Sequence, residues 1–577
     1  MAGVAGGSQQ ISGAKAELSA ALGVLRSAVW GVGLASGLIN VLALTSSIFM
    51  LQVYDRVIPS GSIPTLLALA LLAITLYAFQ GVLEVVRSRL LVRIGGALDQ
   101  SISERIYDIL ARLPLRAKLA NDSVSPLRDL DQMRGFIAGP GLTALFDLPW
   151  IPLYLGICFM FHPLIGIVAT IGALILIALT AMTEWLSKTP VEEAARMMGR
   201  RGRLAEASRR NAEVLQAMGF RHRLGKRWSD ANTEYGAKQQ RVSDVGGSLS
   251  SVSRVLRVVL QSTMLGIGAW LVIEQKASGG VMFASSIMMS RALAPVELSI
   301  ANWRGFVAAR DAWRRLSEML AFMPARVEQL ALPLPNKALS VANVTVVPPG
   351  EKRVVVDGVS FNLLAGQGLG VIGPSASGKS SLIRAIVGVW LPVRGDVRLD
   401  GAELESWDPS VLGDAIGYLP QDVELFDGTI AENICRFLPD PDPAKIIEAA
   451  RAANVHELIL RLSDGYDTQI GEGGTALSAG QRQRIGLARA LFGNPFLVVL
   501  DEPNANLDAE GEEALNIAIS GVRKRGGVVI IVAHRPNVLA TIDLVLVMRD
   551  GRQQAFGPRD EILAQLMKPA APARTPQ

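Results

Sequence analysis

The sequence contains few of the residues that build disulfide frameworks or structural metal sites. Its 577 residues include only two cysteines, Cys158 and Cys435, and four histidines. Their spacing matches neither a disulfide framework nor a Cys/His metal site, so both are unsupported. Charge is also sparse, because charged residues make up 19% of the chain and the net charge is +5. Nothing in this balance indicates nucleic acid as a partner.

Apolar residues, by contrast, are abundant. They make up 50% of the chain, and the mean hydropathy of +0.32 is high for a soluble protein. Buried helices of a soluble domain would need an improbably large core to hold all the long apolar stretches, so we predict six membrane spans. Each reaches the length of about 20 apolar residues that a bilayer requires, and they cover residues 28–50, 64–86, 142–161, 164–182, 255–273 and 281–300. The first is too long for a cleaved signal peptide, so we expect it to be retained.

The loops between the spans differ in their content of lysine and arginine. Residues 87–134 contain nine lysines and arginines, and residues 188–241 contain thirteen. Of the three short connections, the first contains Arg56, the second contains none and the third contains Lys276. The positive-inside rule therefore predicts that both long loops and both termini lie in the cytoplasm. The net positive charge follows mostly from this topology.

Both long loops have mixed charges at helical spacing and little proline or glycine. This pattern predicts that they are helical extensions of the spans. Residues 129–136 (DLDQMRGF) and 211–220 (NAEVLQAMGF) mix apolar and polar side chains and are the candidate tips.

Charged residues lie inside two predicted spans, as Asp147, Arg291 and Glu297. Such groups are costly in lipid, so they either line a polar path or form structural ion pairs. Both interpretations stay open from the sequence. Prolines in the same spans interrupt backbone hydrogen bonding and predict kinks that face a lumen; they are Pro149, Pro152 and Pro295.

A glycine-rich string, GPSASGKS, occupies residues 373–380. It follows a strand-like apolar run and opens a predicted helix at residues 381–387. In this setting backbone N–H groups point at a phosphate, a lysine neutralises it and a serine hydroxyl holds Mg²⁺. Lys379 and Ser380 match the last two roles. The residues predicted to surround the phosphates are Gly373, Pro374, Ser375, Ala376, Ser377, Gly378, Lys379, Ser380 and Ser381.

Two further apolar strands end in residues suited to phosphate chemistry. Residues 496–500 (FLVVL) lead into Asp501 and Glu502, and residues 528–533 lead into His534. Ligand sites of open α/β sheets lie at such carboxyl ends. We expect Asp501 to hold Mg²⁺ through water, Glu502 to activate the attacking water, and His534 to contact the γ-phosphate.

Together with the string LSAGQ at residues 477–481, these motifs resemble the nucleotide-binding domain of ABC transporters. GPSASGKS is similar to the Walker A loop, LVVLDE to the Walker B strand, and LSAGQ to the family signature, with Ala479 a mild departure. Gln421 corresponds to the Q-loop, residues 506–508 to the D-loop and His534 to the switch histidine. One departure is Pro348, which stands where the family usually has an aromatic side chain for adenine stacking, so loose base selectivity is expected.

The resemblance implies a homodimer that binds ATP and Mg²⁺ at two equivalent sites. Each ATP would lie between the Walker A loop of one chain and the signature of the other, formed by Ser478, Ala479, Gly480 and Gln481, with Asp508 nearby. The implied metal ligands are Ser380, Gln421 and Asp501. The implied catalytic residues are Glu502, His534, Gln421 and Lys379.

Four strings in the first half resemble the membrane domain of type I secretion ATPases, in the branch that exports proteases, lipases and haem-binding proteins. They occupy residues 52–60, 128–133, 139–150 and 290–297. This resemblance implies an inner-membrane homodimer that works with a periplasmic adaptor and an outer-membrane tunnel. It also implies export of unfolded polypeptides with a C-terminal signal. The residues before the first span contain no cysteine nucleophile for an N-terminal peptidase.

The predicted fold is an all-α membrane domain of six transmembrane helices, the type I ABC exporter fold, followed by an α/β P-loop ATPase domain. The expected division is a tail at 1–20, the membrane domain at 21–322, a linker at 323–338, the ATPase domain at 339–567 and a tail at 568–577. A lipid or drug exporter of the same architecture is the alternative. A non-hydrolysing ATP-gated channel would predict loss of Glu502, His534 or Ser478, and all three are present.

Overall fold

The computed structural model describes residues 23, 26–116, 126–323, 332–474, 476–504, 509–533 and 539–567. The chain divides into two compact units, with the boundary between Ala325 and Arg326. The described part of the first unit is helical, whereas the second is built on one sheet. Both predicted tails and half of the predicted linker, residues 324–331, lie outside the described residues.

The first unit contains the predicted spans. In the part of the chain that the structure describes, six helical segments are long and apolar enough to cross a membrane, and they overlap the six stretches predicted from hydropathy. The helices of this unit are α2 (Arg26–Leu42), α3 (Thr45–Gln52), η1 (Val53–Val57), α4 (Ile58–Ser60), α5 (Ile63–Arg116), α6 (Pro126–Ile137), α7 (Pro140–Asp147), η2 (Leu148–Trp150), α8 (Ile151–Phe161), α9 (Pro163–Arg210), α10 (Ala212–Ala217), α11 (Arg221–Ile273), α12 (Gly279–Ala301) and α13 (Trp303–Phe322). The prediction of six spans is therefore confirmed.

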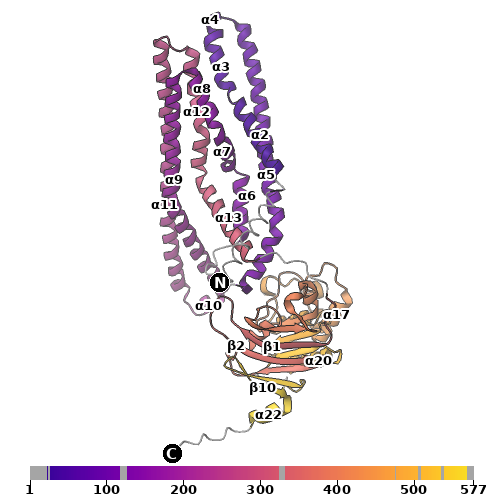
Figure 1. The fold of residues 1–577 in the computed structure, drawn as a ribbon. Helices are drawn as coiled ribbons and strands as arrows, with labels where there is room; N and C mark the ends of the chain where they lie inside the picture. The colour runs from indigo at the N-terminus through magenta and orange to yellow at the C-terminus, as the bar shows by residue number, and fades with distance from the viewer. Residues whose placement is uncertain are drawn as a thin grey trace, which may run out of the picture. The chain divides into compact units, whose positions relative to one another are not determined.

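The spans extend far beyond the apolar stretches. Helices α5, α9 and α11 have 54, 48 and 53 residues, about twice what a bilayer needs. Helices α9 and α11 lie side by side over their length (Figure 1). The short helix α10 connects them, and its C-cap Met218 is 72% exposed. The prediction of helical extensions with a tip at residues 211–220 agrees with this geometry.

The other candidate tip, residues 129–136, is wrong. These residues lie within α6, which packs along α13, and Asp129 is 2% exposed. Arg315 of α13 donates to both carboxylate oxygens of Asp129, at 2.9 and 2.6 Å. The mixture of apolar and polar side chains therefore reflects one face packed in the protein and one in solvent. Residues 117–125, between α5 and α6, lie outside the described residues.

A buried polar cluster joins the first three spans. Arg87 of α5 donates to Asp147 of α7 at 3.0 Å and to Ser36 of α2, also at 3.0 Å. Asn40 of α2 donates to the same carboxylate at 2.8 Å, and Tyr154 of α8 donates to Asn40 at 2.9 Å. Asp147 is thus held as a structural ion pair with further hydrogen bonds around it.

The other charged residues in the spans differ from one another. Glu297 of α12 pairs with Arg257 of α11 at 2.8 Å. Arg291 is exposed and has no hydrogen bond or ion pair within the described residues. Among the prolines, Pro149 lies in η2, where the helix breaks between α7 and α8, whereas Pro295 lies inside the continuous α12.

Residues 52–60, one of the four segments that resemble the membrane domain of type I secretion ATPases, lie at the end of the first span and contact the start of the last span. The carboxylate of Asp55 in η1 accepts from the Gly280 N–H at 2.8 Å and from Ser278 Oγ at 2.5 Å, at the start of α12. A Cβ at Gly280 would lie 2.6 Å from this carboxylate, so only glycine fits. Tyr54 stacks on Phe283, with ring centroids 4.3 Å apart. This carboxylate stabilises the positive end of the α12 dipole.

One ten-stranded sheet forms the frame of the second unit. Its order is β5-β4-β1-β2-β10-β9-β3-β8-β7-β6. Strands β6, β7, β8, β3 and β9 are parallel neighbours, whereas β1, β2, β4 and β5 pair antiparallel. The strands are β1 (Ala338–Val346), β2 (Val356–Leu364), β3 (Gly368–Ile372), β4 (Arg394–Leu399), β5 (Ala402–Glu403), β6 (Ile416–Leu419), β7 (Leu497–Asp501), β8 (Val528–Val532), β9 (Leu544–Arg549) and β10 (Arg552–Pro558).

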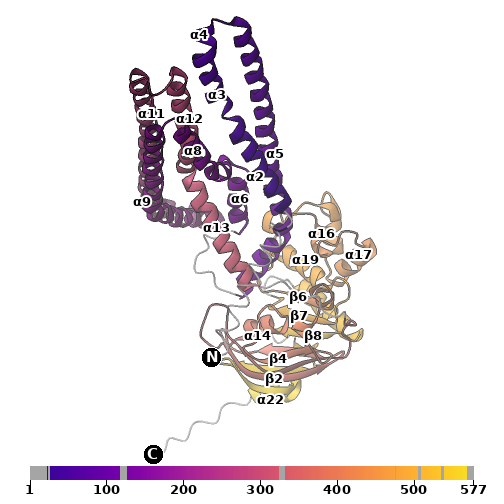
Figure 2. The same ribbon diagram turned by 45° about the horizontal axis from the view of Figure 1, so that its top comes forward.

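Helices cover the parallel part of the sheet, so β7 and β8 are fully buried apolar runs. Figure 2 shows α16, α17 and α19 gathered beside β6 and β7. The helices of this unit are α14 (Lys379–Ile386), η3 (Leu404–Ser406), α15 (Pro409–Ala415), α16 (Ile430–Ile434), α17 (Pro443–Ala452), α18 (His456–Leu460), η4 (Gly465–Asp467), η5 (Glu472–Gly474), α19 (Ala479–Leu491), α20 (Ala509–Lys524) and α22 (Arg559–Met567).

The buried cluster in the spans makes a stability prediction. Arg87→Leu leaves the Asp147 carboxylate buried without its cation, so we expect a loss of about 3–5 kcal/mol. Asp147→Leu should cost a similar amount for the reciprocal reason. The double variant R87L/D147L removes both charges and should recover most of the loss. The unfolding midpoint of the full chain in detergent measures this.

Two outcomes would contradict the prediction. One is a single variant as stable as the parent chain. The other is a double variant whose loss equals the sum of the two single losses, since independent effects would mean that the charges do not interact. Arg56→Leu, outside the cluster, provides the matched control.

Candidate active site

The glycine-rich loop connects β3, a buried central strand, to α14. Gly378, the residue before α14, has φ +93°, and a Cβ there would lie 2.5 Å from the Val355 carbonyl oxygen. A Cβ at Gly373 would lie 2.2 Å from the Met548 carbonyl oxygen. Only glycine allows the loop to pack this closely on β9 and the residue before β2. The N–H groups at the start of α14 are therefore left free to bind an anion.

Lys379 stands at the first position of α14 and is 5% exposed. Its Nζ donates to the carbonyl oxygens of Gly373 and Pro374, both at 2.9 Å. Burial lowers the pKa of Lys379, while the nearby carboxylates of Glu502 and Asp501 act in the opposite direction. The ammonium thus closes the loop on itself and has no direct ion pair with any described residue. A phosphate in the loop would supply the missing counter-charge.

Asp501 ends β7 and is 2% exposed. Among the described residues its Oδ1 has no hydrogen-bond partner, and a side-chain hydrogen bond links the carboxylate to Ser380. Burial raises the pKa of Asp501 above its ordinary value. A buried carboxylate oxygen without a partner, next to a hydroxyl, fits the oxygen ligands that Mg²⁺ prefers. The Oγ of Ser377 on the loop is a second buried polar atom without a partner in the described chain.

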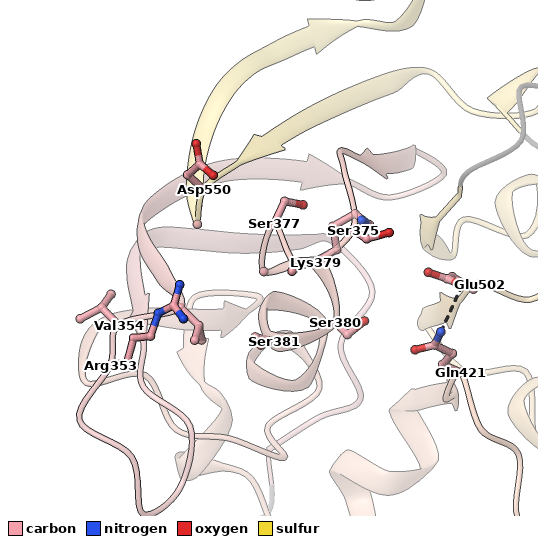
Figure 3. Close-up of a pocket in the computed structure, with 14 residues that line it drawn as sticks. Arg353, Val354, Ser375, Ser377, Lys379, Ser380, Ser381, Gln421, Glu502 and Asp550 are labelled. Atoms are coloured by element: carbon pink, nitrogen blue, oxygen red, sulfur yellow. Dashed lines mark hydrogen bonds between the residues drawn. The ribbon is translucent and has the colours of Figure 1, made fainter.

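Glu502 follows directly and faces the open side of the loop. Its φ is +51°, a left-handed conformation that is strained for glutamate, and its N–H donates to the Val532 carbonyl oxygen at 3.2 Å. The Gln421 Nε2 donates to the Glu502 carboxylate at 3.2 Å (Figure 3). Backbone strain of this kind concentrates at functional sites, where the surrounding structure holds it.

These groups line one cavity of about 530 Å³. Its lining comprises the predicted residues Ser375, Ala376, Ser377, Gly378, Lys379, Ser380, Ser381, Gln421 and Glu502, together with Arg353, Val354, Val355, Asp550 and Gly551. Gly373 and Pro374 lie beneath it as the acceptors for Lys379. The structure thus brings the Walker A loop, the Q-loop glutamine and Glu502 to one place. Asp501 does not line the cavity, but it is hydrogen-bonded to Ser380, which does.

The structure does not bring the signature to this cavity. Ser478 is the N-cap of α19, where its N–H donates to Gln481 Oε1 at 2.8 Å and its Oγ accepts from the Gln481 N–H at 3.3 Å. Ala479 and Gly480 form the first turn of that helix and do not line the cavity. Asp508 and His534 lie outside the described residues.

The sequence prediction missed the residues at the other end of the cavity. Arg353 and Val354 belong to the loop between β1 and β2, and Asp550 and Gly551 form the turn between β9 and β10. Pro348, in the same loop as Arg353, does not line the cavity. None of the missed residues belongs to a motif. The aspartate–glycine pair at residues 550–551, a typical turn sequence, was the only signal in the sequence.

A phosphate loop between β3 and α14, with carboxylates two strands away on β7, defines a P-loop ATPase. Joined in one chain to six membrane-spanning helices, this unit places the protein among membrane-bound, ATP-driven machines.

Comparisons with known proteins give the family. Residues 356–505 match the ABC transporter family, and residues 29–295 match the ABC transporter transmembrane region. The type I secretion system ATP-binding protein PrsD of Rhizobium meliloti is 56% identical, over 96% of both chains. The alpha-hemolysin translocation ATP-binding protein HlyB of Escherichia coli is 27% identical, over 91% of this chain and 75% of that protein.

A solved bacterial Atm1-family ABC exporter has the same fold, with a TM-score of 0.78 and 24% identity, over 94% of this chain and 97% of that one. The chain therefore belongs to the ABC transporter family. The predicted family, exporter fold and ATPase activity are confirmed.

The buried carboxylate of Asp501 makes a pH-dependent prediction. Because its pKa is raised, the ionised form destabilises the fold without ligand, and this cost falls as pH drops through the raised pKa toward the ordinary aspartate value. Asp501→Asn should therefore raise the stability of the ligand-free chain at pH 8, by about 1–3 kcal/mol, and the gain should vanish near pH 4. Thermal unfolding at both pH values measures it.

Asp501→Asn should also lose Mg²⁺-dependent hydrolysis, which separates a ligand-binding role from a structural one. Asp560→Asn is the control, because that carboxylate is 83% exposed. A variant that is less stable than the parent chain at pH 8 would contradict this account of the site.

Proposed function

We propose that the chain is one half of a homodimeric type I secretion transporter that exports unfolded polypeptides across the inner membrane. The observation that carries the proposal is the identity of 56% to a type I secretion ATP-binding protein over 96% of both chains. Relatives named for translocation of alpha-hemolysin and cyclolysin support the same class of cargo. These relatives favour protein export over the lipid or drug alternative.

The half-site geometry supports the dimer. One chain offers the Walker A loop, Gln421 and Glu502 in one cavity, while its signature lies on α19 outside that cavity. We propose that Ser478 and Gly480 of a second chain close the site over the γ-phosphate, with the α19 N-terminus directed at it. Asp508 lies nearby in this arrangement.

The proposed chemistry assigns one task to each residue around the cavity. Lys379 leaves its two carbonyl acceptors and neutralises the phosphates. Ser380, Asp501 and Gln421 would hold Mg²⁺, which supplies charge neutralisation to the phosphates when it is bound. Glu502 accepts a proton from the attacking water and His534 braces the γ-phosphate.

Hydrolysis removes the γ-phosphate that holds the two ATPase units together, so they separate and change the membrane units. The lysine and arginine counts of the loops support a cytoplasmic ATPase unit with both termini in the cytoplasm. A periplasmic adaptor, an outer-membrane tunnel and a cargo with a C-terminal signal are the proposed partners. Membrane lipids surround the exposed apolar faces of the spans.

The assignment of Glu502 predicts a trapped state. Glu502→Gln keeps the size of the side chain and cannot accept a proton, so hydrolysis should fall by about 10²- to 10⁴-fold. ATP should still bind and should accumulate a closed dimer, as seen by size-exclusion chromatography with Mg²⁺ and ATP. Lys379→Ala, in contrast, should lose nucleotide binding. Full turnover by the Glu502→Gln chain would remove this residue from the mechanism.

The same variant tests the cargo class. A cell whose only copy carries Glu502→Gln should lose specific polypeptides from the culture medium, and the parent chain should restore them. Truncating the C-terminus of those polypeptides should retain them in cells that carry the parent chain. An unchanged set of secreted polypeptides, with altered export of lipids or drugs, would support the alternative instead.

A further inference from the structure

The nucleotide cavity has two chemically different ends. Gln421 and Glu502 lie at one end, and Arg353, Val354 and Asp550 lie at the other, with the phosphate loop between them (Figure 3). A γ-phosphate must lie beside Glu502, because this residue activates the attacking water. The rest of the nucleotide therefore extends toward Arg353, and its base lies at that end.

The far end offers no aromatic side chain to a base. The residues that line the cavity in the described chain include no phenylalanine, tyrosine or tryptophan. The flat surface available there is the guanidinium of Arg353. This side chain is exposed and makes no hydrogen bond or ion pair with any described residue. Val354 beside it is apolar and 48% exposed.

Backbone contacts fix this end of the cavity relative to the phosphate loop. The Val355 N–H donates to the Val346 carbonyl oxygen at 2.9 Å, which closes the loop that carries Arg353. The Gly551 N–H donates to the Ser377 carbonyl oxygen at 3.2 Å, so the turn that carries Asp550 rests on the phosphate loop. The backbone next to Arg353 and Asp550 is therefore held in place beside the phosphate loop.

We propose that Arg353 supplies the stacking surface for the base of the bound nucleotide and that the site distinguishes ATP weakly from GTP. A guanidinium plane stacks on the face of any base, since every base has a π-face. The proposal rests on the nucleotide site described above and adds its base-binding end.

Variants of Arg353 separate stacking from charge. Competition against a fluorescent ATP analogue on the full chain measures affinity for ATP and for inorganic tripolyphosphate, which has no base. Arg353→Ala should weaken ATP about ten-fold and leave tripolyphosphate unchanged. Arg353→Tyr restores a flat surface and should bind ATP as the parent chain does. Arg353→Lys keeps only the charge and should resemble the alanine variant.

The reverse pattern would overturn the proposal. If Arg353→Lys retains affinity while Arg353→Tyr loses it, or if tripolyphosphate weakens together with ATP, the guanidinium contacts phosphate and does not stack. Lys352→Ala, an exposed neighbour in the same loop, is the matched control. Lys379→Ala must weaken both ligands, so a failure of the nucleotide site itself is distinguishable from a failure of the proposal.

Turnover tests the weak selectivity. The parent chain should hydrolyse GTP with a kcat/KM within about ten-fold of that for ATP, because a stacking surface without a fitted set of donors and acceptors discriminates poorly. Rejection of GTP by about 10⁴-fold would mean that a hydrogen-bonding base pocket exists and would overturn this part of the proposal.

Discussion

Burial of unneutralised charge at the carboxyl edge of the sheet is the constraint on which the ATPase unit depends. Lys379 is 5% exposed and bonds only to two carbonyl oxygens, and Asp501 is 2% exposed with one carboxylate oxygen that lacks a partner in the described chain. Lys379 begins the helix α14, Asp501 ends the fully buried strand β7, and both are buried, so neither can relax into water. Such charges cost free energy unless a ligand completes them. A polyphosphate with a divalent cation completes both at once, and the strained backbone of Glu502 places its carboxylate beside them.

In the membrane unit, most of the charged side chains inside the spans are paired with an opposite charge. Asp147 pairs with Arg87 and accepts from Asn40, and Glu297 pairs with Arg257. These charges are neutralised by ion pairs within the chain, so they hold spans together across long separations in sequence. The protein thus keeps unsatisfied charge where chemistry requires a ligand and neutralises it where the spans must stay packed. The charge at Arg291 has no such partner in the described residues, which leaves it available to a polar path.

The sequence was sufficient to predict those features that depend on a local pattern of residues. Apolar length predicted the spans, and the loop GPSASGKS with the strand before Asp501 predicted most of the cavity. Tertiary partners were not predictable, because Arg315 lies 186 residues from Asp129 and spacing cannot reveal such a pair. Residues 129–136 therefore looked like an exposed tip, although Asp129 is buried. Arg353 was missed because it belongs to no motif and is placed by the closure of a loop.

The central claim is that each nucleotide site is shared between two chains. Co-expression of two variants tests this claim. Both variants carry Glu502→Gln; one also carries Lys379→Ala and the other also carries Ser478→Arg. Each variant alone should retain no ATP after rapid gel filtration with Mg²⁺. Co-expressed chains should retain ATP, because a mixed dimer joins an intact loop from one chain to an intact signature from the other. Retention no higher than that of either variant alone would contradict the shared site.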